Sequence, residues 1–234
     1  MFLLKNFAIF FFNVIDKLFH QKRIKLYLIK KKINIFFDIG SHLGNYTDLI
    51  FSINHNCKFF MFEPQITIFN KIKKKYSKKK NIKIFNYAIS NKNGVGELFI
   101  NKHDLTSSFS KFNEKNRYLY YKSILFGVRL KSMITKIEKV KKIRLEEFIN
   151  KNKITKIDLI KIDTEGHEFE VLTGIKNKIN IIENILIEFH LSDIYKKYNQ
   201  NKIHKYLEKK GFQLKKRFKF PFTTWEDRIY SKIS

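Results

Sequence analysis

The residues from Ile35 to Thr47 constrain the fold of this chain more than any other stretch. They begin with an apolar run, Ile35 to Ile39, rich in aromatic and β-branched residues, which predicts a buried β-strand. Gly40 and Gly44 follow, and glycine is used where the backbone turns sharply or lies close to a ligand. A helix that opens after such a turn presents free N–H groups and a partial positive charge. The stretch therefore predicts a strand, a tight turn and a helix that together form a binding site.

A second apolar run, Phe59 to Phe62, ends in Glu63-Pro64. An acidic residue at the tip of a second strand, after a glycine turn at the first, is the layout that holds the ribose hydroxyls of a nucleotide-like cofactor. The glycine pattern is not G-x-G-x-x-G, and its leading acid, Asp38, is badly placed to meet a pyrophosphate. The pattern instead favours a cofactor with a cationic amino acid end, such as S-adenosylmethionine.

Composition limits the class of protein. The 234 residues are enough for one α/β domain with a core. The chain has 48 Lys+Arg and 21 Asp+Glu, so its net charge is +27, which suggests a polyanionic partner. The charge is spread along a chain saturated with Lys, Ile, Asn and Phe, which favours biased composition over nucleic-acid binding. The single cysteine, Cys57, excludes an internal disulfide and fits a reducing cytoplasm.

Residues 1–32 read as one or two amphipathic helices ahead of the domain expected over 33–234. No stretch has the ~20 consecutive apolar residues that span a bilayer. A basic amphipathic helix can lie on a membrane surface, so peripheral membrane contact is one interpretation. A helix packed on the edge of the domain is the interpretation that we prefer.

The rest of the chain alternates predicted strands and helices. The predicted strands cover 33–39, 58–62, 82–89, 95–100, 157–162, 185–190, 212–218 and 227–232, with 95–100 forming a hairpin after a turn at 91–94. The predicted helices cover 45–54, 65–76, 145–150, 168–174 and 200–210, and Gly174 ends the fourth. Residues 101–142 have weak periodicity, and their polar patch at 105–109 is either a lid or surface filler. The alternation predicts a mainly parallel sheet with helices on both faces.

Polar residues gather where the predicted strands end. These residues are Asp38, Glu63, Asn86, Ser90, Asp163, Glu165, Glu188 and His190. Ligands bind outside the carboxyl ends of the strands in an open parallel sheet. A buried carboxylate is costly unless something pairs with it, so we expect this row of acids to form a site.

Three segments of the sequence resemble the FkbM family of S-adenosylmethionine-dependent methyltransferases. They are Asp38-Ile-Gly-Ser-His-Leu-Gly-Asn-Tyr-Thr47, Phe62-Glu63-Pro64 and the run from Ile160 to Gly174, which contains Ile-Asp-Thr-Glu-Gly-His-Glu. Asn86-Tyr-Ala-Ile-Ser90 also matches the family's third strand end. Ser41-His42 stands where the family usually has Ala-Asn, and His167 stands where it usually has Ala. The resemblance covers about residues 33–190.

The resemblance implies a class I, Rossmann-like methyltransferase fold with about seven central strands, and it implies the cofactor site. Asp38, Gly40 and Gly44 would hold the methionine end of S-adenosylmethionine, Glu63 the ribose, and 86–90 would border the adenine. The implied cofactor-binding residues are Asp38, Gly40, Ser41, Gly44, Asn45, Tyr46, Thr47, Glu63, Pro64, Asn86, Ala88, Ser90 and Asp163. Members of the family methylate hydroxyl groups, often on sugars or polyketide-like metabolites, so the expected partner is a small molecule or glycan.

Methyl transfer to a hydroxyl group needs a base that takes the proton. The candidate catalytic residues are Asp163, Glu165, His167 and His190. Asp163, Glu165 and Glu188 offer oxygen ligands that suit a divalent cation, although no metal is expected. The rival hypotheses are an RNA methyltransferase, a nicotinamide-dependent oxidoreductase and a non-catalytic Rossmann-like binding module.

Overall fold

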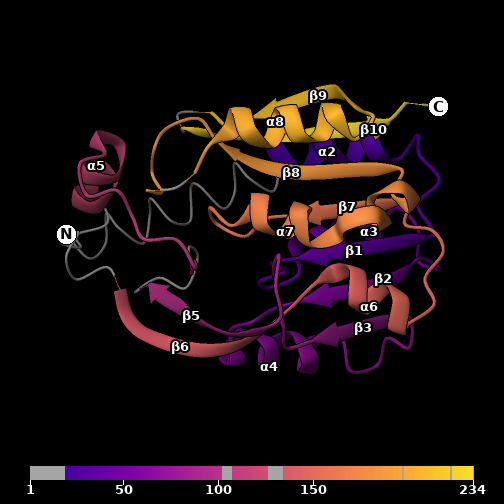
Figure 1. Cartoon of the computed structure of the whole chain (residues 1–234). Helices are drawn as coiled ribbons and strands as arrows, with labels where there is room; N and C mark the ends of the chain where they lie inside the picture. Colours follow the sequence, from indigo (N-terminus) through magenta and orange to yellow (C-terminus); the bar gives the residue numbers. More distant parts are fainter. Residues whose placement is uncertain (1–18, 102–106, 126–133, 197, 222, 234) are drawn as a thin grey trace.

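The structure, a computed structural model, describes residues 19–101, 107–125, 134–196, 198–221 and 223–233 (Figure 1). Its centre is a seven-stranded sheet with the strand order β3-β2-β1-β7-β8-β10-β9. The five parallel strands are β3 (Ile82–Phe85), β2 (Lys58–Phe62), β1 (Ile35–Ile39), β7 (Leu159–Ile162) and β8 (Asn184–His190). Strands β10 (Trp225–Lys232) and β9 (Phe212–Lys219) add an antiparallel edge. The predicted mainly parallel sheet of about seven strands is confirmed.

Helices cover both faces of this sheet, as the alternating pattern predicts (Figure 1). On one face lie α2 (Gln21–Leu28), α3 (Asn45–Phe51) and α4 (Ile66–Lys75). On the other lie α6 (Leu145–Lys151), α7 (Glu168–Ile175), the 3₁₀ helix η3 (Lys176–Ile181) and α8 (Gln200–Lys209). Because side chains alternate along a strand, Phe36 packs toward the first set and Phe37 toward the second. Each face therefore has its own apolar cluster.

Side-chain alternation also determines where the charged residues of the central strands lie. Asp38 is the register partner of Lys161, and Glu188 is the register partner of Asp227. All four side chains are buried, and each lies two positions from a residue that packs toward α2 and α3. The antiparallel strand β10 begins where the parallel strands end, so it places Asp227 at the same edge as their carboxyl ends.

The region after β3 departs from the predicted arrangement. The predicted strand 82–89 is two strands, because β3 ends at Phe85 and β4 (Ala88–Ile89) belongs to a separate sheet with the order β4-β6-β5. The strand predicted over 95–100 is β5 (Gly94–Asn101), and the predicted hairpin with the preceding strand is wrong. β5 instead pairs antiparallel with β6 (Ile134–Ile143), which arises from the segment of weak periodicity, as does α5 (Arg117–Leu125).

Gly174 does not end its helix. It lies inside α7, which continues to Ile175, and a Cβ there would be 2.0 Å from the backbone oxygen of Ser90. This glycine therefore allows α7 to pack closely against the end of β4.

The described part of the N-terminal segment packs on the domain. Ile24 and Leu28 of α2 are fully buried against Phe36, Phe218 and other residues of the sheet. Residues 1–18 lie outside the described residues, as does most of the segment predicted to contact a membrane. Within the described residues, no helix is both long enough and apolar enough to cross a bilayer.

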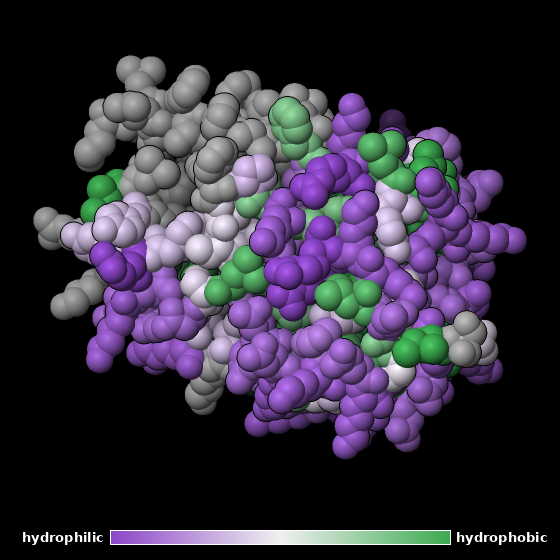
Figure 2. Space-filling view, turned by 90° about the horizontal axis from the view of Figure 1, so that it is seen from above, coloured by the Kyte–Doolittle hydropathy of each residue, from purple (hydrophilic) through white to green (hydrophobic). Residues whose placement is uncertain are grey.

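The lysines of α4 and the loop after it are exposed, namely Lys71, Lys73, Lys74, Lys75, Lys78, Lys79 and Lys80. Figure 2 views the molecule from above the edge that carries β9 and α8, and this face is mostly hydrophilic with hydrophobic side chains in small, separate patches. The hydrophilic residues are therefore spread over this face and not gathered in one patch.

Candidate functional site

The turn between β1 and α3 requires glycine at two positions. Gly40 has φ +77°, and a Cβ there would lie 1.8 Å from the backbone oxygen of Asp163. Gly44 has φ +79°, and a Cβ there would lie 2.3 Å from the hydroxyl of Tyr76. Between them, His42 also has a positive φ of 43°, which is uncommon for a residue with a side chain. The turn thus brings the end of β1 directly against the end of β7.

Asp38 is buried at the end of β1 beneath this turn. The hydroxyl of Thr47, in the first turn of α3, donates a hydrogen bond of 2.8 Å to Asp38 Oδ2. Burial raises the pKa of Asp38 to about 6, although the Thr47 hydrogen bond and the charge of Lys161 act in the opposite direction. Asp38 is therefore an acid held in a place where a nearby cation would favour its charged form.

Glu63 is buried at the end of the neighbouring strand, β2. Its carboxylate accepts hydrogen bonds from the backbone N–H groups of His42 (2.9 Å) and Gln65 (2.8 Å). Burial raises the pKa of Glu63 to about 7, and these two hydrogen bonds act to lower it. The carboxylate is thus fixed by local backbone groups between the glycine turn and the start of α4.

The other residues predicted to bind the cofactor fall into two groups. Ser41, Asn45, Tyr46 and Pro64 lie on the turn, on α3 or directly after β2, and so border Asp38 and Glu63. Asn86 ties this region together, because its amide donates to the backbone oxygens of Glu63 and Pro64 at 2.9 Å each. Ala88 and Ser90 belong instead to β4 and the residue after it, and Ala88 packs in the small core of the second sheet.

A buried ion-pair network lies beside Asp38. Lys161 on β7 is 1% exposed, and its ammonium group lies 2.8 Å from Asp227 Oδ1 and 3.4 Å from Asp163 Oδ2. Asp227 also contacts His20 Nε2 at 2.8 Å and accepts a hydrogen bond of 2.5 Å from the Tyr46 hydroxyl. Burial alone would raise the pKa of Asp227, but Lys161 and His20 outweigh it and hold this pKa well below its usual range. The network supports the strand end that carries Asp163.

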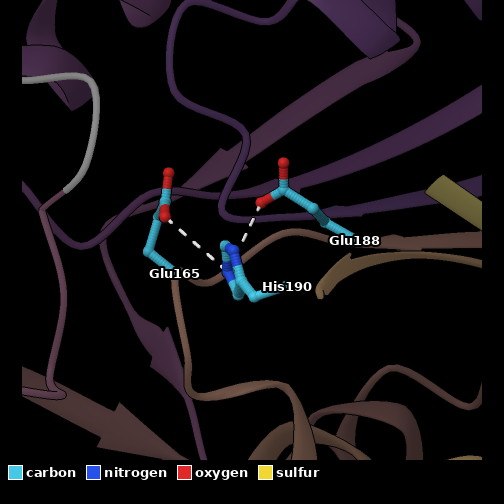
Figure 3. A group of neighbouring side chains, drawn as sticks. All are labelled: Glu165, Glu188 and His190. Atoms are coloured by element: carbon cyan, nitrogen blue, oxygen red, sulfur yellow. Dashed lines mark ion pairs between the residues drawn. The ribbon is translucent and has the colours of Figure 1, made fainter. Parts of the chain in front are cut away.

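A second polar cluster, formed by Glu165, Glu188 and His190, lies at the ends of β7 and β8. The imidazole of His190 lies between the two carboxylates (Figure 3), with Nε2 3.8 Å from Glu165 Oε2 and 3.8 Å from Glu188 Oε2. Glu188 is buried, and its pKa is raised well above its usual value by that burial and by the charges of Asp163 and Glu165. Three of the predicted residues at the strand ends are therefore brought together.

His167 faces a different neighbourhood. Its Nε2 lies 3.0 Å from the Ser90 hydroxyl, and its ring packs against Phe109. Burial lowers the pKa of His167 to about 4, with a smaller contribution from Lys142, so the ring is neutral at pH 7. The structure thus links His167 to the second sheet and His190 to the central one.

Several residues of the site are missing from the sequence-based prediction. Asp227 and Tyr195 come from late in the chain, and Tyr195 donates a hydrogen bond of 2.5 Å to Glu165 Oε2. Ser108 donates to the backbone oxygen of Glu165, and Ser110 donates to that of Gly166 at 2.9 Å. The polar patch at 105–109 therefore includes residues that cover the β7–α7 turn, although 105 and 106 are outside the described residues. Lys161 carried a usable signal, because it is a charged residue inside the apolar run 157–162.

The charge of this edge suits a cationic cofactor. Asp38, Glu63, Asp163, Glu165 and Glu188 are carboxylic acids at the ends of four neighbouring strands, and Lys161 is the buried cation next to them. The raised pKa values of Asp38 and Glu63 show that burial opposes their charge. S-adenosylmethionine carries a sulfonium and an ammonium group, so Asp38 and Glu63 fit it by charge and by position, and it supplies an activated methyl group when bound.

Comparison with known proteins identifies the domain. Residues 38–214 match the family described as "Methyltransferase FkbM domain". Solved structures with the same fold include a S-adenosylmethionine-dependent methyltransferase from Aquifex aeolicus (TM-score 0.52, 12% identity, 94% of this chain and 93% of that one). They also include TrmK from M. capricolum with S-adenosyl-homocysteine (TM-score 0.50, 12% identity, 92% and 68%). Another is a putative rRNA-methylase from Clostridium thermocellum (TM-score 0.52, 10% identity, 92% and 97%).

One curated relative has a name that states a substrate class. The Hexuronic acid methyltransferase AglP of Haloferax volcanii is 33% identical over 51 residues. This match covers 22% of the present chain and 21% of AglP, so the chain aligns with about a fifth of that relative.

The fold and the family match together define the class of the domain as a S-adenosylmethionine-dependent methyltransferase. The chain belongs to the FkbM methyltransferase family, because the match covers more than half of its length. The expectations about family, fold and cofactor are thereby confirmed.

Proposed function

We propose that the chain transfers a methyl group from S-adenosylmethionine to a hydroxyl oxygen of a sugar, a glycan or a small metabolite. The observation that carries this proposal is the pairing of two clusters at one edge of the sheet. Asp38 and Glu63 suit the cationic donor, while Glu165, Glu188 and His190 form a second polar group at the ends of the next two strands of the sheet, β7 and β8. An oxygen acceptor that must lose a proton suits the second cluster.

The protein's part in this reaction is position and electrostatics. The acceptor oxygen forms the new O–CH₃ bond as the S–CH₃ bond of the donor breaks, and the hydroxyl proton passes to a base. Asp163 lies on the turn between the two clusters, with a side chain that is 30% exposed and held 3.4 Å from Lys161. Of the four candidate bases, we therefore assign Asp163 as the one that accepts the hydroxyl proton, with Glu165 and His190 beside it.

The relative that acts on a hexuronic acid supports a carbohydrate acceptor, although the match is short. The net charge of +27 is the feature that favours RNA instead. The test is transfer of labelled methyl from S-adenosylmethionine to three groups of acceptors: hexuronic acids and glycans that contain them, hydroxylated small metabolites, and total RNA.

The proposal expects label in a sugar or metabolite and retention of that label after mild alkali, because a methyl ether survives conditions that hydrolyse a methyl ester. Label that is lost in alkali would mean transfer to a carboxylate. Label confined to RNA would overturn the proposal and support an RNA methyltransferase. An Asp163→Asn variant tests the assigned base, and we expect its transfer rate to fall about 10²-fold or more while donor affinity changes much less.

A further inference from the structure

Glu165, Glu188 and His190 bring together three groups that commonly bind metal ions. One ligand atom from each residue lies within 4.8 Å of the ligand atoms of the other two. Figure 3 shows the two carboxylates on either side of the imidazole. We propose that this cluster binds a divalent cation which holds the acceptor oxygen for methyl transfer, an inference that rests on the proposed function for its role but not for the binding itself.

The first support is the state of Glu188. Its side chain lies on a central strand and the residue is 8% exposed. Among the described residues, no group donates a hydrogen bond to its Oε2 atom, and His190 Nε2 is 3.8 Å away, which is beyond hydrogen-bond length. A buried carboxylate oxygen without a donor is costly. It is accounted for if a cation sits next to it.

The second support is the way in which Glu165 is held. Its backbone has a φ of 52°, a left-handed conformation that is strained for a residue with a side chain. Residues with such backbone strain are found mainly at functional sites. The Tyr195 hydroxyl fixes the carboxylate through the hydrogen bond at Oε2. Gly166 makes room for Tyr195, because a Cβ at this glycine would be 2.6 Å from the tyrosine ring. The local structure therefore directs Glu165 toward His190.

The third support is charge. Glu165 and Glu188 lie close to Asp163, and Lys161 is directed to Asp227 at 2.8 Å and to Asp163 at 3.4 Å. The negative charges of Glu165 and Glu188 therefore repel each other, and the positive charge of Lys161 offsets this repulsion only in part, because its ion pairs are with Asp227 and Asp163. A divalent ion among them would remove this repulsion.

The ligand set indicates which ions to expect. Two carboxylate oxygens and one imidazole nitrogen suit Mn²⁺ or Zn²⁺ better than Mg²⁺, which prefers oxygen ligands alone. Ligands about 2.1 Å from one ion lie about 3 to 4 Å from each other. The 3.8 Å separations around His190 are within that range, and the cluster closes on an ion with small side-chain movements.

Three protein ligands leave coordination positions open for an acceptor. An oxygen bound there is held in place and loses its proton more readily, because a metal ion lowers the pKa of a bound hydroxyl group. The proton passes to Asp163 and the oxygen then attacks the donor methyl carbon. In this arrangement His190 is a metal ligand and not the base.

Metal binding is tested directly by titrating the metal-stripped 234-residue chain, without a histidine tag, with Mn²⁺ and following free Mn²⁺ by electron paramagnetic resonance. We expect one saturable site, and we expect Glu188→Gln and His190→Gln each to weaken it at least about tenfold. Glu138→Gln and His204→Gln are the matched controls, since Glu138 is buried on β6 beside Lys136, and His204 on α8 contacts Tyr230 of β10. Thermal melting of each variant confirms that it folds.

Absence of a saturable Mn²⁺ or Zn²⁺ site, or a site that both variants leave unchanged, would overturn the metal proposal. The role of the ion is then tested by methyl transfer after chelation, which we expect to fall at least about tenfold and to return with Mn²⁺, while S-adenosylmethionine affinity changes by less than about threefold. Full transfer by the chelated enzyme would keep the proposed function and reject the ion's part in it. Failure of the folded chain to bind S-adenosylmethionine would reject the proposed function instead, and the Mn²⁺ titration would still judge the site.

Discussion

The two halves of the proposed site, a cofactor side at β1 and β2 and an acceptor side at β7 and β8, are built in different ways. On the cofactor side, the acids are held by groups that are close in sequence or on the neighbouring turn. The Thr47 hydroxyl donates a hydrogen bond to Asp38. The backbone N–H groups of His42 and Gln65 donate to Glu63. On the acceptor side, Lys161 and Glu165 depend on partners from the far end of the chain, with Asp227 66 residues away from Lys161 and Tyr195 30 residues away from Glu165.

This difference leads us to expect that donor binding and methyl transfer respond differently to substitution. The hydrogen bonds that hold Asp38 and Glu63 run between the neighbouring segments β1, α3 and β2, whereas Tyr46 of α3 donates to Asp227 on the late strand β10. The acceptor side is complete only when β10 has paired with β8 and the segment around Tyr195 has folded over the β7–α7 turn. We therefore expect substitutions on the acceptor side to affect stability and transfer more than they affect donor binding.

The largest expected effect is that of Lys161→Met. Removing the ammonium group leaves Asp227 and Asp163 without their buried partner, and breaking a buried ion pair on one side costs about 3–5 kcal/mol. Urea unfolding of wild type and variant measures the loss. Lys156→Met is the control, because Lys156 is 57% exposed and its pair with Asp158 is worth no more than about 1 kcal/mol. Equal losses in the two variants would contradict a special role for the buried network.

Gly166→Ala should have the next largest effect. The new Cβ would lie 2.6 Å from the Tyr195 ring, and the alanine would have to adopt a φ of 91°. Such strain costs about 1–3 kcal/mol of folding stability and displaces the tyrosine that fixes Glu165. We expect methyl transfer to fall at least about tenfold while calorimetry finds S-adenosylmethionine affinity within about threefold of wild type. A loss of donor affinity as large as the loss of transfer would mean that the two halves are not separate.

A smaller effect is expected from pH on the cofactor side. The pKa values of Asp38 and Glu63 are about 6 and about 7 in the free protein, both above their usual values because of burial. Their protonated forms therefore stabilise the free protein at low pH, and that contribution is lost as the pH rises through 6 and 7. A cationic donor prefers the charged forms, so its affinity should rise about tenfold between pH 6 and pH 8, with protons released on binding. Calorimetry in buffers of different ionisation enthalpy measures both; a flat pH profile would contradict the assignment.

Most of the central sheet is predictable because its signals are local. The strand predicted over 58–62 is confirmed at both ends, and the glycine turn after Ile39 was found from the residue types alone. The second sheet was missed because its pairing is long-range: β4 pairs with residues of β6 that lie 54 positions later, and β5 with residues that lie 33 to 48 positions later. The predicted strand 82–89 ends at Phe85, because the Asn86 side-chain amide donates hydrogen bonds to the carbonyl oxygens of Glu63 and Pro64.

The site follows the same division. Asp38 and Glu63 were found because acids after apolar strands and glycine turns form a pattern within a few residues. Asp227 was not found, because the short run around it gives no sign that β10 starts at the same edge as the parallel strands end. The grouping of Glu165 with Glu188 and His190 also depends on tertiary structure, since a turn at the end of β7 meets the end of β8.

Glu63 and Asp38 are the residues to which the proposed site for S-adenosylmethionine at the ends of β1 and β2 is assigned. The most direct measurement is calorimetric titration of S-adenosylmethionine into wild type, Glu63→Ala and the exposed control Glu97→Ala. Loss of the hydrogen bonds that a carboxylate makes, worth about 1.5–3 kcal/mol, predicts at least about tenfold weaker binding in Glu63→Ala and unchanged binding in Glu97→Ala. Equal affinity in all three proteins, or binding of NAD in place of S-adenosylmethionine, would contradict this assignment.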